Sequence, residues 1–265
     1  MPSRRSLLRS TASGALVAVA GCAERAGEIR ERAEAEQGVG TPETTVDDGA
    51  VERAGEVGRR LRESVVYLEA SAGNRGRRAA TGFRFEGGDA GGAYVVTNAH
   101  NVAGAGEFTA WTLAGERRDA ELVDYVESLR PDIALLRVEG FDAPAPPTGS
   151  ADALEPGQPL VQVGHPSIMG NWVITVGPFE DRGGFGADVL RSHVPGMQGN
   201  SGSPLATLDG DVVGLTHGAT SGERRGPDDP PRRPTDDDAH TELVGQMVSL
   251  HVPVGTVAER ISEWA

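Results

Sequence analysis

The sequence contains no lysine. All 25 of its basic residues are arginines, Asp and Glu together number 39, and the formal net charge is −14. This excess of acid argues against nucleic acid and against an anionic membrane surface as electrostatic partners. An acidic surface without lysine is typical of proteins adapted to high salt, where screening within about 3 Å at 1 M makes self-repulsion tolerable. A GC-rich genome that favours Arg and Ala codons predicts the same composition, and both explanations stay open.

Cysteine and aromatic residues are also scarce. Cys22 is the one cysteine, so an intramolecular disulfide is excluded. Aromatic residues make up 5% of the chain while glycine occurs 37 times, which predicts many turns and short strands. The 265 residues suffice for one large or two small domains, and the supply of Val, Leu and Ala is enough for a hydrophobic core.

Residues 1–22 have the pattern of an export signal. The start with Arg4 and Arg5 resembles a twin-arginine signal, and the apolar run over 11–20 is about half the ~20 residues of a membrane-spanning helix. Val-Ala-Gly-Cys at 19–22 resembles a lipobox, which predicts lipidation of Cys22; the alternative is a cysteine without function in a discarded leader. We therefore expect export and a lipid anchor at the extracytoplasmic face of the cell membrane, followed by an acidic, solvated tether over 23–50.

The remainder, residues 51–265, is expected to be all-β, because apolar runs recur between turn residues without any βαβ alternation. A short helix is expected to lead in over 51–63, and an amphipathic helix over 254–265 to end the chain. The expected strands are 64–70, 80–85, 92–100, 108–113, 120–126 and 132–138 in a first unit (about 60–143), and 159–164, 171–176, 189–194, 204–207, 211–216 and 247–252 in a second (about 155–253). Residues 221–238 are expected to form a long exposed loop.

Three polar residues at strand edges form a candidate catalytic site. Ser201 lies between Gly199 and Gly202, and such a turn can point several N–H groups into one concavity; alone, it would favour a structural turn. A serine nucleophile needs an adjacent base and N–H donors for the oxyanion. His100 ends one expected strand and can be the base, and Asp132 opens another and can orient that base.

The motifs around these residues resemble those of trypsin-like serine proteases, and among them the HtrA-type enzymes of bacteria and archaea. They read Thr-Asn-Ala-His at 97–100, Asp-Ile-Ala-Leu-Leu at 132–136 and Gly-Asn-Ser-Gly-Ser-Pro at 199–204, in the family's order within about residues 60–260. The resemblance implies a chymotrypsin-like fold of two six-stranded antiparallel β-barrels, here in a chain whose composition looks haloarchaeal. Asp132 is preferred over Asp124 because it directly adjoins the apolar strand, as in the family.

The resemblance also implies a role for each site residue. His100, Asp132 and Ser201 would be the catalytic triad, and Gly199, Asn200 and Ser201 the oxyanion hole. A substrate pocket for a small or medium apolar side chain would involve Pro195, Gln198, Thr216, His217 and Gly218. The histidines other than His100, namely His165, His193, His217, His240 and His251, show no metal-ligand spacing, so neither a metal nor a cofactor is expected.

Two residues depart from the family pattern. Ser203 stands where glycine is usual, and Gln198 where the HtrA-type enzymes often have proline. The chain is also expected to lack the PDZ domain that these enzymes often carry, because it ends soon after the protease unit.

The expected function is that of a serine endopeptidase, tethered outside the cytoplasm, that hydrolyses protein or peptide substrates through an acyl-enzyme. The alternative is a catalytically inactive homologue that acts as a peptide- or partner-binding lipoprotein. An esterase is a third hypothesis, because the same acyl chemistry serves esters. The sequence predicts no oligomeric state.

Overall fold

The computed structural model describes residues 46–71, 77–89, 92–166, 170–183, 188–217, 236–243 and 247–265. The expected signal with Cys22 and almost all of the expected tether lie outside these residues, as do Gly218 and most of the loop expected over 221–238. Within the described part of the chain, no helix is both long and apolar enough to cross a membrane.

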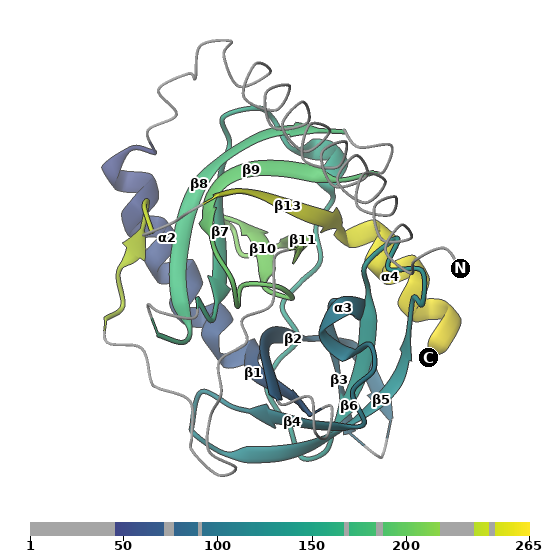
Figure 1. Cartoon of the computed structure of the whole chain (residues 1–265). Coiled ribbons are helices and arrows are strands. Elements are labelled where there is room, and N and C mark those ends of the chain that lie inside the picture. The colour runs from purple at the N-terminus through teal and green to yellow at the C-terminus, as the bar shows by residue number, and fades with distance from the viewer. Residues whose placement is uncertain are drawn as a thin grey trace, which may run out of the picture. The chain divides into compact units, whose positions relative to one another are not determined.

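The first half of the folded unit is a closed antiparallel barrel, coloured blue to teal in Figure 1. Its strands are β1 (Val65–Ser71), β2 (Arg77–Asp89), β3 (Gly92–Thr97), β4 (Glu107–Trp111), β5 (Arg117–Tyr125) and β6 (Ala134–Val138), in the order β1-β2-β3-β6-β5-β4. Because side chains alternate across a strand, one apolar set points inward, and Val66, Leu68, Val95 and Leu136 fill the interior.

The second half is a second barrel. Its strands are β7 (Pro159–Gly164), β8 (Val173–Arg182), β9 (Leu190–Gly196), β10 (Pro204–Thr207), β11 (Val212–His217) and β13 (Met247–Pro253). The order β8-β7-β10-β11-β13-β9 closes because β8 also pairs with β9, and Leu160, Phe179 and Leu205 pack inside. The expected fold class of two six-stranded antiparallel barrels is confirmed. The two-residue strand β12 (Ala239–His240), parallel to β8, was not predicted.

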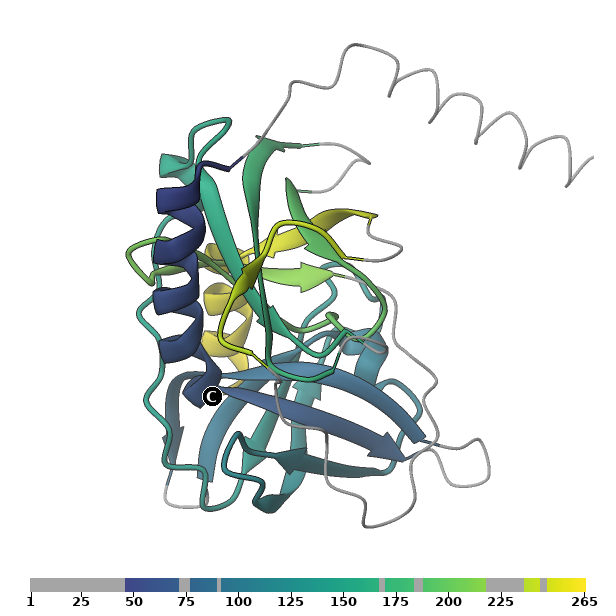
Figure 2. The ribbon, with the colours of Figure 1, turned by 90° about the vertical axis from the view of Figure 1, so that its left-hand side faces the viewer.

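Helix α2 (Asp48–Leu61) runs along the second barrel, as Figure 2 shows. The Asp47 side chain accepts a hydrogen bond from Ala50 N (2.9 Å) and caps the helix. The helix therefore starts at Asp48 and not at residue 51, the expected start. The buried face of α2 packs on β7 and β8, and Gly58 lies so close to Ile174 that a side chain there would collide with it.

The other helical segments in the described residues are η1 (Arg62–Ser64), α3 (Ala99–Val102), η3 (Ala151–Ala153) and α4 (Val254–Trp264). Helix α4 buries Val257 and Ile261, as its sequence pattern predicted. The expectation that one strand runs as far as His100 is wrong: β3 ends at Thr97 and His100 lies on α3. The chain turns at Asn98, whose side-chain amide donates to Asp132 O (2.9 Å).

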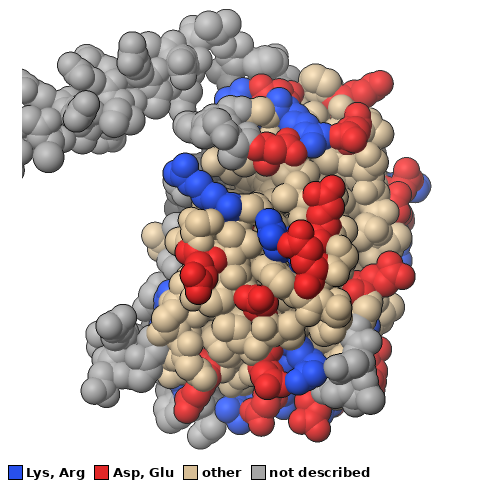
Figure 3. All heavy atoms as spheres, turned by 90° about the vertical axis from the view of Figure 1, so that its right-hand side faces the viewer, with Lys and Arg blue, Asp and Glu red and all other residues tan. Residues whose placement is uncertain are grey.

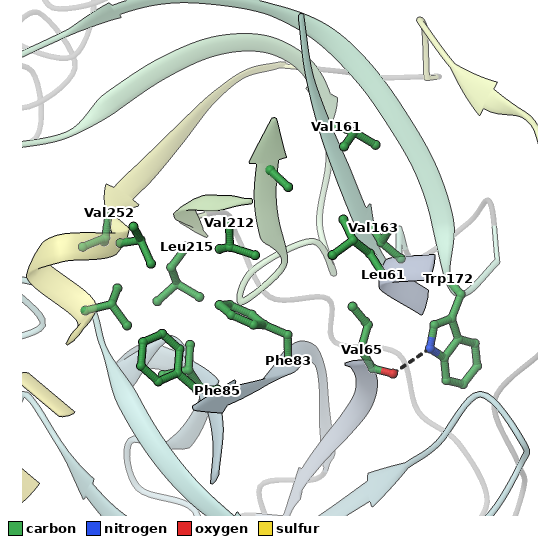
Figure 4. Close-up of a cluster of buried hydrophobic side chains, with 14 of the residues drawn as sticks. Leu61, Val65, Phe83, Phe85, Val161, Val163, Trp172, Val212, Leu215 and Val252 are labelled. Atoms are coloured by element: carbon green, nitrogen blue, oxygen red, sulfur yellow. Dashed lines mark hydrogen bonds between the residues drawn. The ribbon is translucent and has the colours of Figure 1, made fainter. Parts of the chain in front are cut away.

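A shared hydrophobic core joins the two barrels (Figure 4). Its buried members include Val65, Phe83 and Phe85 of the first barrel, Leu61 of α2, and Val161, Val163, Val212, Leu215 and Val252 of the second barrel. Trp172 Nε1 donates a hydrogen bond to Val65 O (2.9 Å), the dashed line in Figure 4. Burial of each large apolar side chain contributes about 1.5–3 kcal/mol, so this core holds the two barrels in a fixed relation.

Figure 3 shows the face of the molecule that lies to the right in Figure 1. Acidic side chains are spread over this face with arginines beside several of them, and no basic patch gathers on it. Exposed ion pairs of the protein include Arg260–Glu263 (2.5 Å), within α4. On this face, acidic and basic side chains are therefore interspersed rather than gathered by sign.

Candidate active site

His100 and Asp132 are held together by two hydrogen bonds. Nδ1 of His100 lies 2.5 Å from Asp132 Oδ2, and the backbone N of His100 donates to Asp132 Oδ1 (2.9 Å). Asp132 precedes β6 and its side chain is 3% exposed. Asp124, the competing candidate, is exposed on β5 and accepts from Tyr125 N (2.7 Å), so the structure brings Asp132 and not Asp124 to the histidine.

Asp132 is ionised despite its burial. Burial by itself would raise the pKa of this carboxyl group, but hydrogen bonds from His100 and His217 hold the pKa well below its usual range. A carboxylate that accepts from Nδ1–H fixes the imidazole of His100 as the Nδ1–H tautomer and leaves a lone pair on Nε2. That is the tautomer that a general base needs.

His217, at the end of β11, also reaches Asp132. Its Nδ1 lies 2.7 Å from Asp132 Oδ2, the same oxygen that His100 contacts. The two imidazole rings meet edge to face with their centroids 5.5 Å apart. The hydrogen bond to Asp132 raises the pKa of His217, and its side chain is 46% exposed. The resemblance implied a place for His217 in a substrate pocket, but the sequence contained no signal for this contact.

The turn that carries Ser201 is bound to the first barrel. Thr81 N donates to Ser201 O (2.9 Å), and Thr81 Oγ1 donates to Gly199 O (2.9 Å). The side-chain amide of Asn101, the residue after His100, also donates to Ser201 O (3.3 Å). Gly202 has φ +90° and packs directly on Thr81 O, where any side-chain carbon would collide. The sequence needs glycine there for both reasons.

The structure brings Ser201 next to the helix that carries His100 but does not join the two side chains. Ser201 is fully buried. Nε2 of His100 is buried too and has no hydrogen-bond partner among the residues that the structure describes. Hydrogen bonds of this kind often tighten only when substrate is bound.

Of the expected oxyanion residues, Asn200 uses its own N–H inside the turn. Asn200 N donates to Met197 O (3.1 Å), and Ser203 N donates to Asn200 O (3.0 Å). Gly199 has φ +99°, a conformation that glycine adopts without strain. These contacts shape the turn and leave Gly199 and Ser201 as the candidates for oxyanion donors.

The expected pocket residues differ in their exposure. Pro195 is buried in β9, and Gln198 is exposed in the turn before Ser201. Thr216 donates its N–H to Ser203 O (2.8 Å) and accepts from Gly202 N (2.9 Å), so both of its backbone groups are used within the protein. Among the expected pocket residues that the structure describes, the side chains of Gln198 and His217 thus reach solvent.

Thr216 also belongs to a buried chain of hydrogen bonds. Ser192 Oγ lies 2.8 Å from His251 Nε2, His251 Nδ1 lies 3.0 Å from Thr216 Oγ1, and Thr216 Oγ1 donates to Gln162 Oε1 (2.6 Å). Because the Thr216 proton goes to Gln162, His251 donates from Nδ1 and accepts from Ser192 at Nε2. Burial, with a smaller effect of His217, lowers the pKa of His251 to about 3.

Two closed six-stranded barrels, with a His–Asp pair and a Gly-Asn-Ser-Gly turn at their junction, define a chymotrypsin-like protein. The sequence profile of the trypsin-like peptidase domain matches residues 80–215, just over half of the 265 residues. The chain belongs to this family.

Curated relatives are HtrA- and DegP-like serine proteases. The "Probable periplasmic serine endoprotease DegP-like" of Pseudomonas fulva is 35% identical over 129 residues, which are 46% of this chain and 26% of the relative. "Serine protease HTRA1" of Xenopus laevis is 32% identical over 130 residues, 46% of this chain and 28% of the relative. The match thus spans about a quarter of the length of these relatives.

Solved structures support the fold. The active form of the Rv3671c protease from M. tuberculosis is 24% identical, with a TM-score of 0.62 over 83% of this chain and 87% of that chain. The HtrA-type protease AlgW with a tripeptide is 20% identical, with a TM-score of 0.60 over 79% of this chain and 62% of that chain. The expected trypsin-like family is thus confirmed by the sequence profile, and the likeness to HtrA-type proteases is one of partial sequence similarity and of fold.

Proposed function

We propose that this protein is a serine endopeptidase that cleaves protein or peptide substrates through an acyl-enzyme. The observation that carries the proposal is the buried, ionised Asp132, which accepts from Nδ1 and from the backbone N of His100. This arrangement leaves the lone pair of Nε2 on the side of His100 away from Asp132. The turn that carries Ser201 is held beside the same helix by Asn101.

In the proposed reaction, Ser201 Oγ attacks the carbonyl carbon of the peptide while Nε2 of His100 takes its proton. Asp132 stabilises the imidazolium that forms and keeps the ring in place. N–H groups of Gly199 and Ser201 stabilise the oxyanion, and the loss of one such donor typically costs about 2.7–4 kcal/mol. His100 then protonates the leaving amine, and water releases the acyl group by the reverse sequence.

A second candidate function is that of an inactive homologue that binds peptides or a partner protein. It is favoured by one observation: Nε2 of His100 lacks a hydrogen-bond partner among the described residues. An activated serine reacts with a fluorophosphonate, and a serine without a working base does not.

The test is labelling of the purified protein at high salt with a fluorophosphonate probe. Wild type should be labelled, Ser201→Ala should not, and Ser262→Ala, which removes an exposed hydroxyl from α4, should be labelled like wild type. Equal labelling of wild type and Ser201→Ala, or no labelling of either, contradicts the proposal. Cleavage of casein, followed in parallel, distinguishes a peptidase from an esterase.

We also propose that the protein acts outside the cytoplasm, exported by a twin-arginine signal and held at the membrane by a lipid on Cys22. The signal and lipobox patterns of residues 1–22 support this, as does the word periplasmic in the names of relatives. Cys22→Ser should move the protein from the membrane fraction to the soluble fraction of its cells. Replacement of Arg4 and Arg5 by lysine should keep the protein in the cytoplasm, and export unchanged by that replacement contradicts the twin-arginine assignment.

A further inference from the structure

His217 gives Asp132 a second imidazole neighbour that the proposed reaction does not require. Nδ1 of His100 and Nδ1 of His217 lie 2.5 Å and 2.7 Å from Asp132 Oδ2, and one ligand atom from each of the three residues lies within 4.8 Å of the other two. The three side chains come from α3, from the segment before β6 and from the end of β11, so two barrels contribute to one cluster. Two imidazole nitrogens and one carboxylate oxygen are a common set of metal ligands.

We propose that His100, Asp132 and His217 form a binding site for a transition-metal dication, Zn²⁺ above all, and that an ion in this site blocks the peptidase. The proposal that a metal ion binds here is argued from the geometry of the three side chains. The proposal that the bound ion inhibits cleavage rests in addition on the proposed function.

The donor set selects among metals. Zn²⁺ binds imidazole nitrogen and carboxylate oxygen in a tetrahedron, whereas Mg²⁺ and Ca²⁺ take oxygen ligands. Zn–N and Zn–O bonds of about 2.0–2.2 Å place tetrahedral ligand atoms about 3.4 Å apart. The two contacts of Asp132 Oδ2, at 2.5 Å and 2.7 Å, would therefore open by less than about 1 Å on binding. His217 is 46% exposed and can make this movement, and water can fill the fourth position from its open side.

The surroundings orient the carboxylate and set its charge. Asp132 is held from behind by the backbone N of His100 at Oδ1 (2.9 Å), and Oδ2, which both imidazoles face, is the oxygen that would bind the ion. One nearby charge opposes a cation. The guanidinium of Arg78 donates to the carbonyls of His100 (3.0 Å) and Ala103 (2.6 Å), which places a positive charge near the site. The net charge of −14 favours cations near the whole molecule.

An ion in this site would stop the proposed reaction through the tautomer of His100. In the free protein the ring proton is on Nδ1 and the lone pair is on Nε2. An imidazole that binds a metal through Nδ1 carries its proton on Nε2 instead, transferred through water. Nε2 then has no lone pair to accept the proton of Ser201, and Asp132, now bound to a dication, no longer stabilises an imidazolium.

Binding is measured first, in a form that needs no activity. Full-length Ser201→Ala, without a histidine tag, is titrated with Zn²⁺ by calorimetry, and with Co²⁺ by the visible absorption of a tetrahedral site. We expect one ion per chain. His217→Asn and His217→Gln, each in the Ser201→Ala background, should weaken binding at least tenfold. His193→Asn, the matched control, removes a partly buried histidine that lies 3.7 Å from Glu180, and should bind like the parent.

The outcomes of this binding experiment are decisive for the site. No binding to Ser201→Ala, or equal weakening by the His217 and His193 substitutions, overturns it. The unfolding midpoint of each variant is recorded alongside, and the two His217 substitutions guard against a single variant that fails to fold.

Inhibition is measured second, on the active protein. Zn²⁺ should suppress peptide cleavage over the concentration range in which it binds, EDTA should restore it, and His217→Asn should need at least tenfold more Zn²⁺, each variant being compared with its own metal-free rate. Cleavage that persists when the site is full overturns the inhibition. Binding without any cleavage or fluorophosphonate labelling in metal-free buffer contradicts the proposed function and leaves the metal site standing.

Discussion

Gly164 and Ser203 meet where the turn that carries Ser201 packs against the end of β7. Ser203 is fully buried, and its hydroxyl occupies the space that a side chain at Gly164 would need. Asn200 Oδ1 would lie 3.1 Å from a Cβ at the same position. The hydroxyl that distinguishes Ser203 from the glycine of the family pattern is therefore matched by the absence of a side chain opposite. This departure is compatible with an ordered turn.

Gly164→Ala should destabilise the protein and slow the labelling of Ser201. An added methyl group in a tightly packed site typically costs about 1–3 kcal/mol. Ser203→Gly in the same background should recover part of that loss, because it removes the atom that the new methyl group meets. Urea unfolding and labelling rates measure both effects. Gly106→Ala, at a glycine with open space around it, is the control; a double mutant no better than Gly164→Ala refutes the pairing.

Asp132→Asn should lower kcat for peptide cleavage by about 10⁴-fold, the typical loss when the residue that orients the base can no longer hold the right tautomer. Steady-state kinetics on a peptide substrate measure the loss. Asp124→Asn is the matched control, since Asp124 is exposed on the neighbouring strand and contacts Tyr125 N rather than a histidine. Similar losses in both variants would remove Asp132 from the proposed triad.

At the scale of elements, four strands of the second barrel are joined by polar side chains inside a hydrophobic environment. Gln162 on β7, Ser192 on β9, Thr216 on β11 and His251 on β13 form one directed chain of hydrogen bonds. Every member is buried. Such a network fixes strand register when its hydrogen bonds are made, and it is costly to disturb by adding a charge.

The network predicts sensitivity to acid. The pKa of His251 falls from 6.5 to about 3 on folding, so the unfolded chain takes up its proton first as pH drops. Stability is therefore lost as pH falls from about 6.5 towards about 3, by up to about 1.4 kcal/mol per pH unit. His251→Gln should flatten the dependence of unfolding free energy on pH by that amount. Urea unfolding from pH 7 to pH 4 measures it, and parallel curves for the two proteins would refute the assignment.

Sequence patterns predicted the strands well because each strand is determined by its own residues and by the turn residues beside it. Runs such as Val65–Tyr67 are β-branched or aromatic and lie between turn residues, and each expected strand overlaps an observed one. β12 was not predicted because two residues, Ala239 and His240, are too few to show an alternation. The contact of His217 with Asp132 was not predictable either, since it depends on how two barrels meet rather than on any spacing along the chain.

At the scale of the whole molecule, the net charge is strongly negative. Partly exposed ion pairs such as Arg191–Asp181 (2.5 Å) offset some of the repulsion. Such pairs contribute little individually, about 0–1 kcal/mol, and they weaken in salt. Salt also weakens the repulsion within a protein of net charge −14. We expect this loss of repulsion to outweigh the weakening of the ion pairs.

Raising KCl from about 0.1 M to about 1 M, which shortens the Debye length from about 10 Å to about 3 Å, should therefore raise Tm. Each kcal/mol gained corresponds to about 2–4 °C for a domain of this size. Calorimetry at the two salt concentrations measures the shift, and sucrose at matched osmolality separates charge screening from general exclusion effects. A Tm that is unchanged or lower in KCl would show that the ion pairs outweigh the net repulsion.

The attachment of the Ser201 turn to Thr81 has a consequence for how the protein is made. Ribosomes deliver the chain from its N-terminus, so the barrel with Thr81, His100 and Asp132 emerges before Ser201 has been synthesised. In the proposed reaction, a growing chain would therefore hold the base and its carboxylate before it holds the nucleophile. Ser201 can contact Thr81 only after its own turn has been synthesised, so under the proposed mechanism a nascent chain would not yet cleave its neighbours on the same messenger RNA.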